Sequence, residues 1–213
     1  MATIEFMTLA ETPSTLIEFS FAAPRKTMVD FGGVPILGTH GDAAVEIIPG
    51  ATVDISVVLQ GGMRPDPKGW EVPITIKFFA PGADVLKDTP IAKFNTMTAK
   101  AEGRAISSVT GIIPDTYDIT VVSQHTLMNL KRNVVISLPG TAVDMGTLLE
   151  GNANDDKIIN ISDFGILALS FMEMKGDEAF DERADFDRNG IVNISDFGLL
   201  AVNFMKTSPV EIP

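Results

Sequence analysis

Two short stretches of this sequence place carboxylate and amide side chains at alternate positions, a pattern that suits the binding of a hard cation. In the second stretch, oxygen-bearing side chains occupy positions 1, 3, 5, 9 and 12 of a twelve-residue loop that begins at Asp185 and ends at Asp196, and position 6 is Gly190. An EF-hand-type loop surrounds calcium with this spacing and adds the backbone carbonyl of position 7. We therefore predict that one calcium ion is bound by Asp185, Asp187, Asn189, Ile191 (through its carbonyl), Asn193 and Asp196.

A duplication supports this interpretation, because residues 160–172 recur with most positions unchanged as residues 193–205. An Asx-rich turn ahead of a helix is the alternative, since Asn and Asp also cap helices. Two loops in register favour calcium, although both end in Asp where Glu is usual. The loop ahead of the first copy predicts a second calcium ion bound by Asn152, Asn154, Asp156, Ile158 (through its carbonyl), Asn160 and Asp163.

The two loops are not equivalent. Lys157 stands at position 6 of the first loop, where the sharp turn favours a positive φ that glycine adopts freely, so we expect strain of about 1 kcal/mol there. The first loop also offers two carboxylates, Asp156 and Asp163, against three in the second. Calcium affinity rises with ligand charge, so we expect the second loop to bind more tightly. Asp155, at position 4, is expected to point outward.

Each loop is followed by a segment with two apolar stripes. Phe164, Leu167, Ala168 and Phe171 have the i, i+3, i+4, i+7 spacing of a core-facing helix, and residues 197, 200, 201 and 204 repeat it. We expect the two helices to pack on each other about a pseudo-twofold axis. A segment of roughly 55 residues has no room to bury the second stripe as well. That stripe either packs on the upstream domain or, as we favour, forms a partner-binding face.

Calcium loop, exit helix, short linker, calcium loop and exit helix follow one another in residues 151–206, an order that closely resembles a type I dockerin. This family consists of small modules that dock onto cohesin domains in cellulosome-like, polysaccharide-degrading assemblies. The resemblance covers about a quarter of the chain and departs from the family at Lys157. It implies a cohesin-like partner and contact at loop positions 10 and 11. The predicted partner-binding residues are Ile161, Ser162, Leu169, Met172, Ile194, Ser195, Val202 and Met205.

Composition narrows the possible partners and compartments. The formal net charge is −12, and an acidic chain without a basic patch argues against nucleic acid. No apolar run approaches the roughly 20 residues of a membrane span. Cysteine is absent, which leaves the compartment open on redox grounds. Millimolar calcium outside cells would fill even weak loops, so we expect an extracellular, secreted or cell-surface location. The first residues have neither the basic nor the apolar region of a signal peptide.

The chain before the loops is predicted to consist of short strands rich in Val, Ile, Thr and Phe, separated by Pro- and Gly-containing turns. Residues 113–121 resemble a strand entry common in Ig-like and carboxypeptidase-regulatory-like sandwiches, with Tyr117 anchoring a turn. We therefore predict a mixed, two-module protein: an antiparallel β-sandwich over residues 1–146, similar to an X-module, and a small all-α dockerin-like module over residues 147–213. The predicted strands are residues 16–21, 45–48, 52–59, 72–79, 91–97, 105–109, 117–122 and 134–138.

Catalytic constellations are missing from the sequence. His40 and His125 are the only histidines and stand far apart, and no serine has a nucleophile-elbow setting. Trp70, the only tryptophan, is expected to be partial core rather than a sugar-stacking residue. We therefore expect no enzyme, but a non-catalytic assembly protein that docks onto its partner in a calcium-dependent way. The alternative is a self-assembling structural protomer, in which a β-edge pairs with residues 1–14 of a neighbouring copy to build a fibre or layer.

Overall fold

The computed structural model describes residues 30–31, 34–35 and 50–213. The chain divides into two units, Met1–Pro49 and Gly50–Pro213. In the first unit the described residues form two short antiparallel strands, β1 (Asp30–Phe31) and β2 (Val34–Pro35). The strands predicted for residues 16–21 and 45–48, residues 1–14 and His40 all lie outside the described residues.

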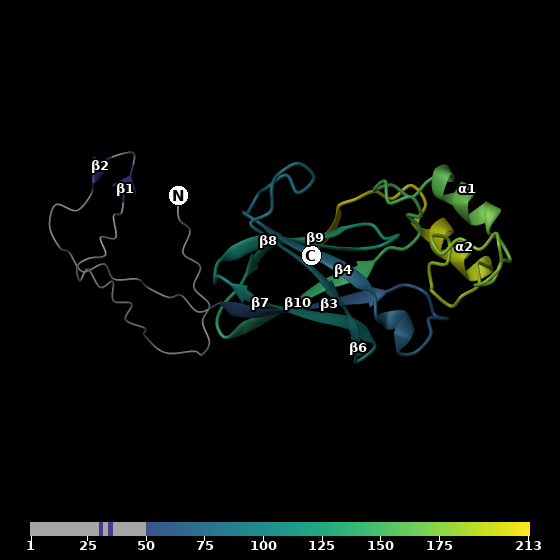
Figure 1. Ribbon diagram of the computed structural model, residues 1–213, viewed down its shortest axis with the longest axis horizontal. Coiled ribbons are helices and arrows are strands. Elements are labelled where there is room, and N and C mark those ends of the chain that lie inside the picture. The colour runs from purple at the N-terminus through teal and green to yellow at the C-terminus, as the bar shows by residue number, and fades with distance from the viewer. Residues whose placement is uncertain (1–29, 32–33, 36–49) are drawn as a thin grey trace, which may run out of the picture. The chain divides into compact units, whose positions relative to one another are not determined.

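The second unit is a β-sandwich of one four-stranded and one five-stranded sheet (Figure 1). The four-stranded sheet has the order β10-β3-β7-β6 and the five-stranded sheet the order β11-β9-β8-β4-β5. The strands are β3 (Ala51–Leu59), β4 (Pro73–Phe79), β5 (Ala92–Met97), β6 (Ala99–Ala101), β7 (Arg104–Ile112), β8 (Thr116–Ser123), β9 (Asn129–Val135), β10 (Gly140–Leu148) and β11 (Val210–Ile212).

Alternation of apolar residues along the strands creates the core between the sheets. Val53, Ile55 and Val57 of β3 are fully buried, as are Ile76 and Phe78 of β4, because every second side chain of a strand points to the same face. The sequence located β3, β4, β5, β7 and β8 to within a few residues of their observed bounds. These strands are the ones in which apolar residues alternate most regularly.

The predicted aromatic roles are confirmed. The Tyr117 hydroxyl donates a hydrogen bond to the carbonyl of Ile113 at 2.9 Å and so fixes the turn into β8. Its ring packs edge-on against Phe78 with the ring centroids 5.6 Å apart. Trp70, in the short 3-10 helix η1 (Lys68–Trp70), is partly buried against the core of the sandwich.

The prediction of a purely antiparallel sheet arrangement is wrong. β10 pairs parallel with β3, and β11 pairs parallel with β9. β9 and β10 are consecutive in the chain but belong to opposite sheets, so the chain crosses between the sheets at Leu138 and Pro139 instead of forming a hairpin. The second sheet then receives its last strand from the C-terminus of the chain.

The prediction of a separate all-α module is also wrong. Only two short α-helices occur in the described residues, α1 (Ile161–Leu169) and α2 (Ile194–Asn203), and most other residues after β10 form turns and loops. Residues Gly50–Pro213 form one compact unit, and the domain boundary predicted after residue 146 falls inside β10. The physical reason is a shared core, because Leu127, beside β9, is buried among Ile159, Leu167 and Leu200.

α1 and α2 lie together at one end of the sandwich (Figure 1). No helix in the residues that the structure describes has the length and apolar character needed to cross a membrane.

Candidate functional site

Each helix begins where a predicted calcium loop ends, and a capping box joins the two. The Asn160 side chain accepts a hydrogen bond from the backbone N–H of Ser162 at 2.7 Å, and the Asp163 carboxylate accepts the N–H of Asn160 at 2.8 Å. Asn193 and Asp196 repeat both bonds at the start of α2. The caps satisfy backbone donors that a helix leaves free at its first turn and also hold the position-12 carboxylates in place.

The two loop–helix repeats are related by a pseudo-twofold axis, which confirms the predicted packing. The N–H of Met205 donates to the carbonyl of Ile159 at 2.7 Å, and the corresponding pair, Met172 and Val192, makes the same bond at 2.8 Å. Each loop is therefore bonded to the segment that follows the other helix. The rings of Phe164 and Phe197 meet edge-on across the helix pair, with centroids 6.1 Å apart.

The prediction that one apolar stripe of each helix faces the core is correct only in part. Leu167 and Leu200 are buried, but Ala168 and Phe171 are exposed. The buried side chains one turn further along are polar, and one of them is Asn203, which bonds to the sandwich. The helices therefore bury Ser170 and Asn203 near their ends and leave more apolar surface exposed than the helical wheel predicted.

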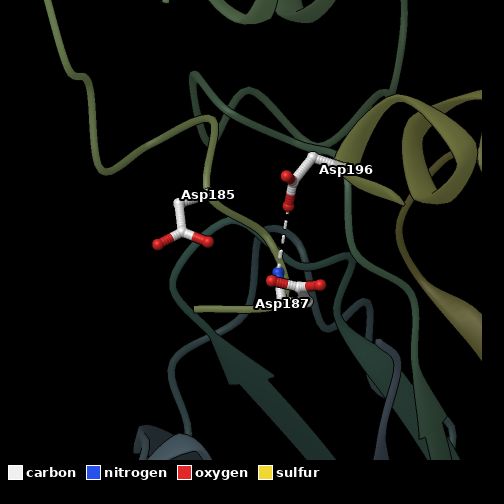
Figure 2. Close-up of side chains that lie close together, drawn as sticks. All are labelled: Asp185, Asp187 and Asp196. Carbon is white, nitrogen blue, oxygen red and sulfur yellow. Dashed lines mark hydrogen bonds between the residues drawn. The ribbon is translucent and has the colours of Figure 1, made fainter. Parts of the chain in front are cut away.

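The second loop brings its three carboxylates together (Figure 2). Asp185, Asp187 and Asp196 are all buried, and one oxygen of each lies within 4.8 Å of the others. The N–H of Asp187 donates to Asp196 at 3.2 Å, and the N–H of Gly190 donates to Asp185 at 2.9 Å. Backbone N–H groups therefore aim the carboxylates inward, as a cation-binding loop requires.

The electrostatics of this cluster favour a cation. Burial, together with the carboxylates of Asp187 and Asp185, raises the pKa of Asp196 to about 6 against the lowering effect of two backbone hydrogen bonds. Burial likewise raises the pKa of Asp185. No lysine or arginine in residues 50–213 forms an ion pair with any of the three. Buried carboxylates without a protein counter-charge are costly, and a bound divalent ion would remove that cost.

The first loop is more open and holds fewer charges. Asn154 and Asp156 are exposed, whereas Asp163 at position 12 is buried, and burial raises the pKa of Asp163. Asn152 at position 1 is buried, and its side-chain oxygen Oδ1 has no hydrogen-bond partner. A buried oxygen normally finds a partner, so this atom is free to serve as a ligand. Hard oxygen donors in this arrangement fit calcium in both loops.

Positions 4, 6 and 9 of the loops differ in their roles. Lys157 has φ +79° and Gly190 has φ +86°, which confirms that position 6 needs the left-handed region in both loops. Asp155 points away from the loop, as predicted, because it accepts a hydrogen bond from the N–H of His125 at 2.8 Å. The side chain of Asn193 donates to the carbonyl of Ile191 at 3.3 Å while its oxygen caps α2. Position 9 therefore has a structural role here, and in such loops it often reaches the ion through water.

The second apolar stripe is exposed, so the alternative that it packs on the upstream sandwich is excluded for the part of the chain that the structure describes. The exposed fractions range from 63% for Val202 to 83% for Leu169. Ser162 is exposed and Ser195 half-buried. Because the repeats are pseudo-symmetric, the stripes form a duplicated apolar surface. Its apolar members are Ile161, Leu169, Met172, Ile194, Val202 and Met205.

Sequence reasoning missed the residues that attach the loops to the sandwich. Arg64 and Glu150 form an ion pair with side chains 1% exposed. Burial raises the pKa of Glu150 to about 7, and the Arg64 charge opposes that rise. Asn203 at the end of α2 donates to Gln60 at 2.6 Å and to the carbonyl of Glu150 at 2.8 Å. These partners are far apart in the sequence, and no local pattern marks them.

No protein-family model and no curated protein matches this chain. The solved structures that share its fold include two from one organism. The first is a C-terminal interface mutant of a type II cohesin–X-dockerin complex from Acetivibrio cellulolyticus, with a TM-score of 0.56 and 16% identity over 74% of this chain and 97% of the other. The second is an N-terminal interface mutant of a type II complex from the same organism, with a TM-score of 0.54 and 18% identity over the same shares of the two chains.

A third solved structure, a type II cohesin–dockerin domain from Bacteroides cellolosolvens, is 37% identical over 29% of this chain and 93% of that chain. Its TM-score of 0.25 is too low to support a structural argument. The first two comparisons, at under 25% identity, show the fold of the chain.

Proposed function

We propose that this chain is a non-catalytic extracellular assembly protein that binds two calcium ions and docks onto a cohesin-type domain through α1 and α2. The observation that carries the proposal is the duplicated apolar surface, whose six side chains are at least 63% exposed beside two cation-suited loops. Exposed apolar patches of this kind usually mark interaction sites. The two solved structures from Acetivibrio cellulolyticus are cohesin–X-dockerin complexes, and the type I dockerin resemblance of residues 151–206 points to the same class of partner.

Calcium would act here by ordering the docking surface. Ile161 and Ser162 directly precede Asp163, the last residue of the first loop, and Ile194 and Ser195 precede Asp196 in the second. A bound ion would hold each position-12 carboxylate and therefore the first turn of each helix. Millimolar calcium outside cells would keep both loops filled, which supports an extracellular setting. No catalytic role is proposed for any residue.

Calorimetry with the full chain and purified cohesin domains of types I and II tests the proposal. We expect binding to at least one type in millimolar calcium and none after chelation. Leu169→Asp combined with Val202→Asp should abolish binding, because both side chains lie in the apolar surface and are mostly exposed. Val135→Asp is the matched control, since Val135 is 65% exposed on β9, outside that surface. Binding that survives chelation or the double substitution contradicts the proposal.

A self-assembling protomer is the second candidate function. It is supported by β5, which is an edge strand of the five-stranded sheet and carries exposed Met97. An open edge offers unpaired backbone groups to a neighbouring strand. Light scattering in calcium without any added partner separates the two candidates, because a protomer of a fibre or layer should grow unaided whereas a docking protein should stay at constant mass.

A further inference from the structure

The two loops are nearly the same in sequence but differ in how far they are covered. Asp187, at position 3 of the second loop, is fully buried, whereas Asn154, at position 3 of the first, is exposed. The second loop is covered by residues of the sandwich that belong to the connection between β3 and β4.

Gly61 in this connection makes the closest approach. Its φ is +101°, and a side-chain Cβ placed on it would lie 2.5 Å from the Cβ of Asp187. Real Cβ atoms essentially never come so close, so the connection can cover Asp187 only because residue 61 has no side chain. The neighbouring Gly62 has open space around its Cβ position.

Arg64 from the same connection fixes the backbone of the second loop. Its guanidinium donates to the carbonyl of Phe186 at 2.8 Å, and Phe186 lies between the position-1 and position-3 ligands. The same group donates to the carbonyl of Gly69 at 3.1 Å and pairs with the buried Glu150 carboxylate. Because the guanidinium is planar and is held from several sides, it keeps the Phe186 carbonyl in one position.

The first loop lacks these contacts. Ala153 takes the place of Phe186 there, and no arginine in residues 50–213 donates to its carbonyl. The side-chain bond that the first loop makes to the sandwich is the one from the N–H of His125 to Asp155, at position 4, which points away from the ion.

We propose that the connection between β3 and β4 is a positioning element of the second calcium loop, acting through Gly61 and Arg64, so that the affinity of this loop for calcium depends on the folded sandwich. The inference rests on the proposed calcium binding. A site held in its binding geometry before the ion arrives binds more tightly, because less ordering remains to be done on binding. The first loop is bonded instead to the connection between β8 and β9, where the N–H of Asn152 donates to the carbonyl of His125 at 3.0 Å, so its calcium affinity should not depend on the connection between β3 and β4.

Nuclear magnetic resonance titration of the full chain with calcium tests the proposal, because each loop has its own reporter. The amide of Gly190 donates to Asp185 in the second loop, and the amide of Ile158 donates to Asp156 in the first. In Gly61→Ala, we expect the calcium affinity reported by Gly190 to fall at least tenfold and that reported by Ile158 to change less than threefold. Gly62→Ala should leave both affinities unchanged.

Gly82→Ala is a second control, because Gly82 also has a positive φ but lies in open space, so it reports the cost of backbone strain alone. If Gly61→Ala fails to fold, Arg64→Met combined with Glu150→Gln decides, since it removes the bond to Phe186 without leaving an unpaired buried charge. The positioning role of the connection between β3 and β4 is overturned if the variants lower the calcium affinity of both loops equally. It is also overturned if neither Gly61→Ala nor the Arg64 and Glu150 double variant lowers the calcium affinity of the second loop. If the wild-type chain shows no calcium response at either reporter, the proposed calcium binding itself fails.

Discussion

Without calcium, the protein should lose stability as the pH rises from about 5 to 7. The cause is Asp196, whose pKa is raised from 3.8 to about 6, first by burial and then by the nearby carboxylates of Asp187 and Asp185. Between these two values the folded state keeps a proton that the unfolded state has released. The unfolding free energy contributed by this group is therefore largest below pH 4 and falls as the pH rises through about 6.

The size of the effect follows from the pKa difference. A rise from 3.8 to about 6 corresponds to about 3 kcal/mol between the protonated and ionised forms of the folded protein. For a domain of this size, 3 kcal/mol is about 6–12 °C in Tm. Part of this roughly 3 kcal/mol is lost below pH 5. Burial also raises the pKa of Asp185, so Asp185 adds a loss of stability of the same sign. Bound calcium replaces the proton of Asp196 as counter-charge, so the calcium-loaded protein should show a smaller loss, the part that comes from buried Glu150.

Thermal unfolding followed by circular dichroism measures this directly. Calcium-free protein should be prepared on a chelating resin, because soluble chelators weaken at pH 5, and compared with protein in millimolar calcium. Asp196→Asn should reduce the pH dependence of the calcium-free protein, and the remainder should come from buried Glu150, whose pKa is raised to about 7. Asp88→Asn, at an exposed site, should leave the pH dependence unchanged. The reasoning is refuted if calcium-free wild-type protein becomes steadily more stable from pH 5 to 7.

Three further outcomes are expected. The second loop should bind calcium ten- to a hundredfold more tightly than the first, a difference of about 1.4–2.8 kcal/mol. Lys157→Gly should narrow that difference by removing the strain of a lysine at φ +79°, and calcium titrations that resolve the two loops would show it. Leu200→Ala should lower the unfolding free energy by about 2–5 kcal/mol in denaturant titrations, because the side chain is buried in the core shared with the sandwich, whereas Leu169→Ala, at a site 83% exposed, should leave it nearly unchanged. Tyr117→Phe should cost about 1 kcal/mol in the same assay, since it removes only the hydrogen bond to Ile113.

Features encoded within a dozen residues were predictable from the sequence. The loop spacing predicted that Asp185, Asp187 and Asp196 would gather, and the structure places their oxygens within 4.8 Å of one another. The positive φ at Lys157 followed from its position in the turn. The alternation in β3 identified its buried face. In each case the interacting atoms are close in the chain, so local geometry alone limits where they can lie.

Pairings between distant segments were decided by the tertiary structure. Whether β10 would form a hairpin with β9 or join β3 in the other sheet depends on which edge is open once the earlier strands have packed. The same holds for Ala168 and Phe171, which have the spacing of a core face but are exposed in the folded chain.

The difference between the two calcium loops also comes from tertiary contacts. Their sequences suggested a ranking from charge and from Lys157, but Arg64 reaches Phe186 across 122 residues of chain and Gly61 lies against Asp187. A glycine and an arginine in a surface connection carry no local sign of such a role. The free energy of these contacts depends on burial and on the exact distance between two segments, and both quantities exist only after the sandwich and the loops have packed together.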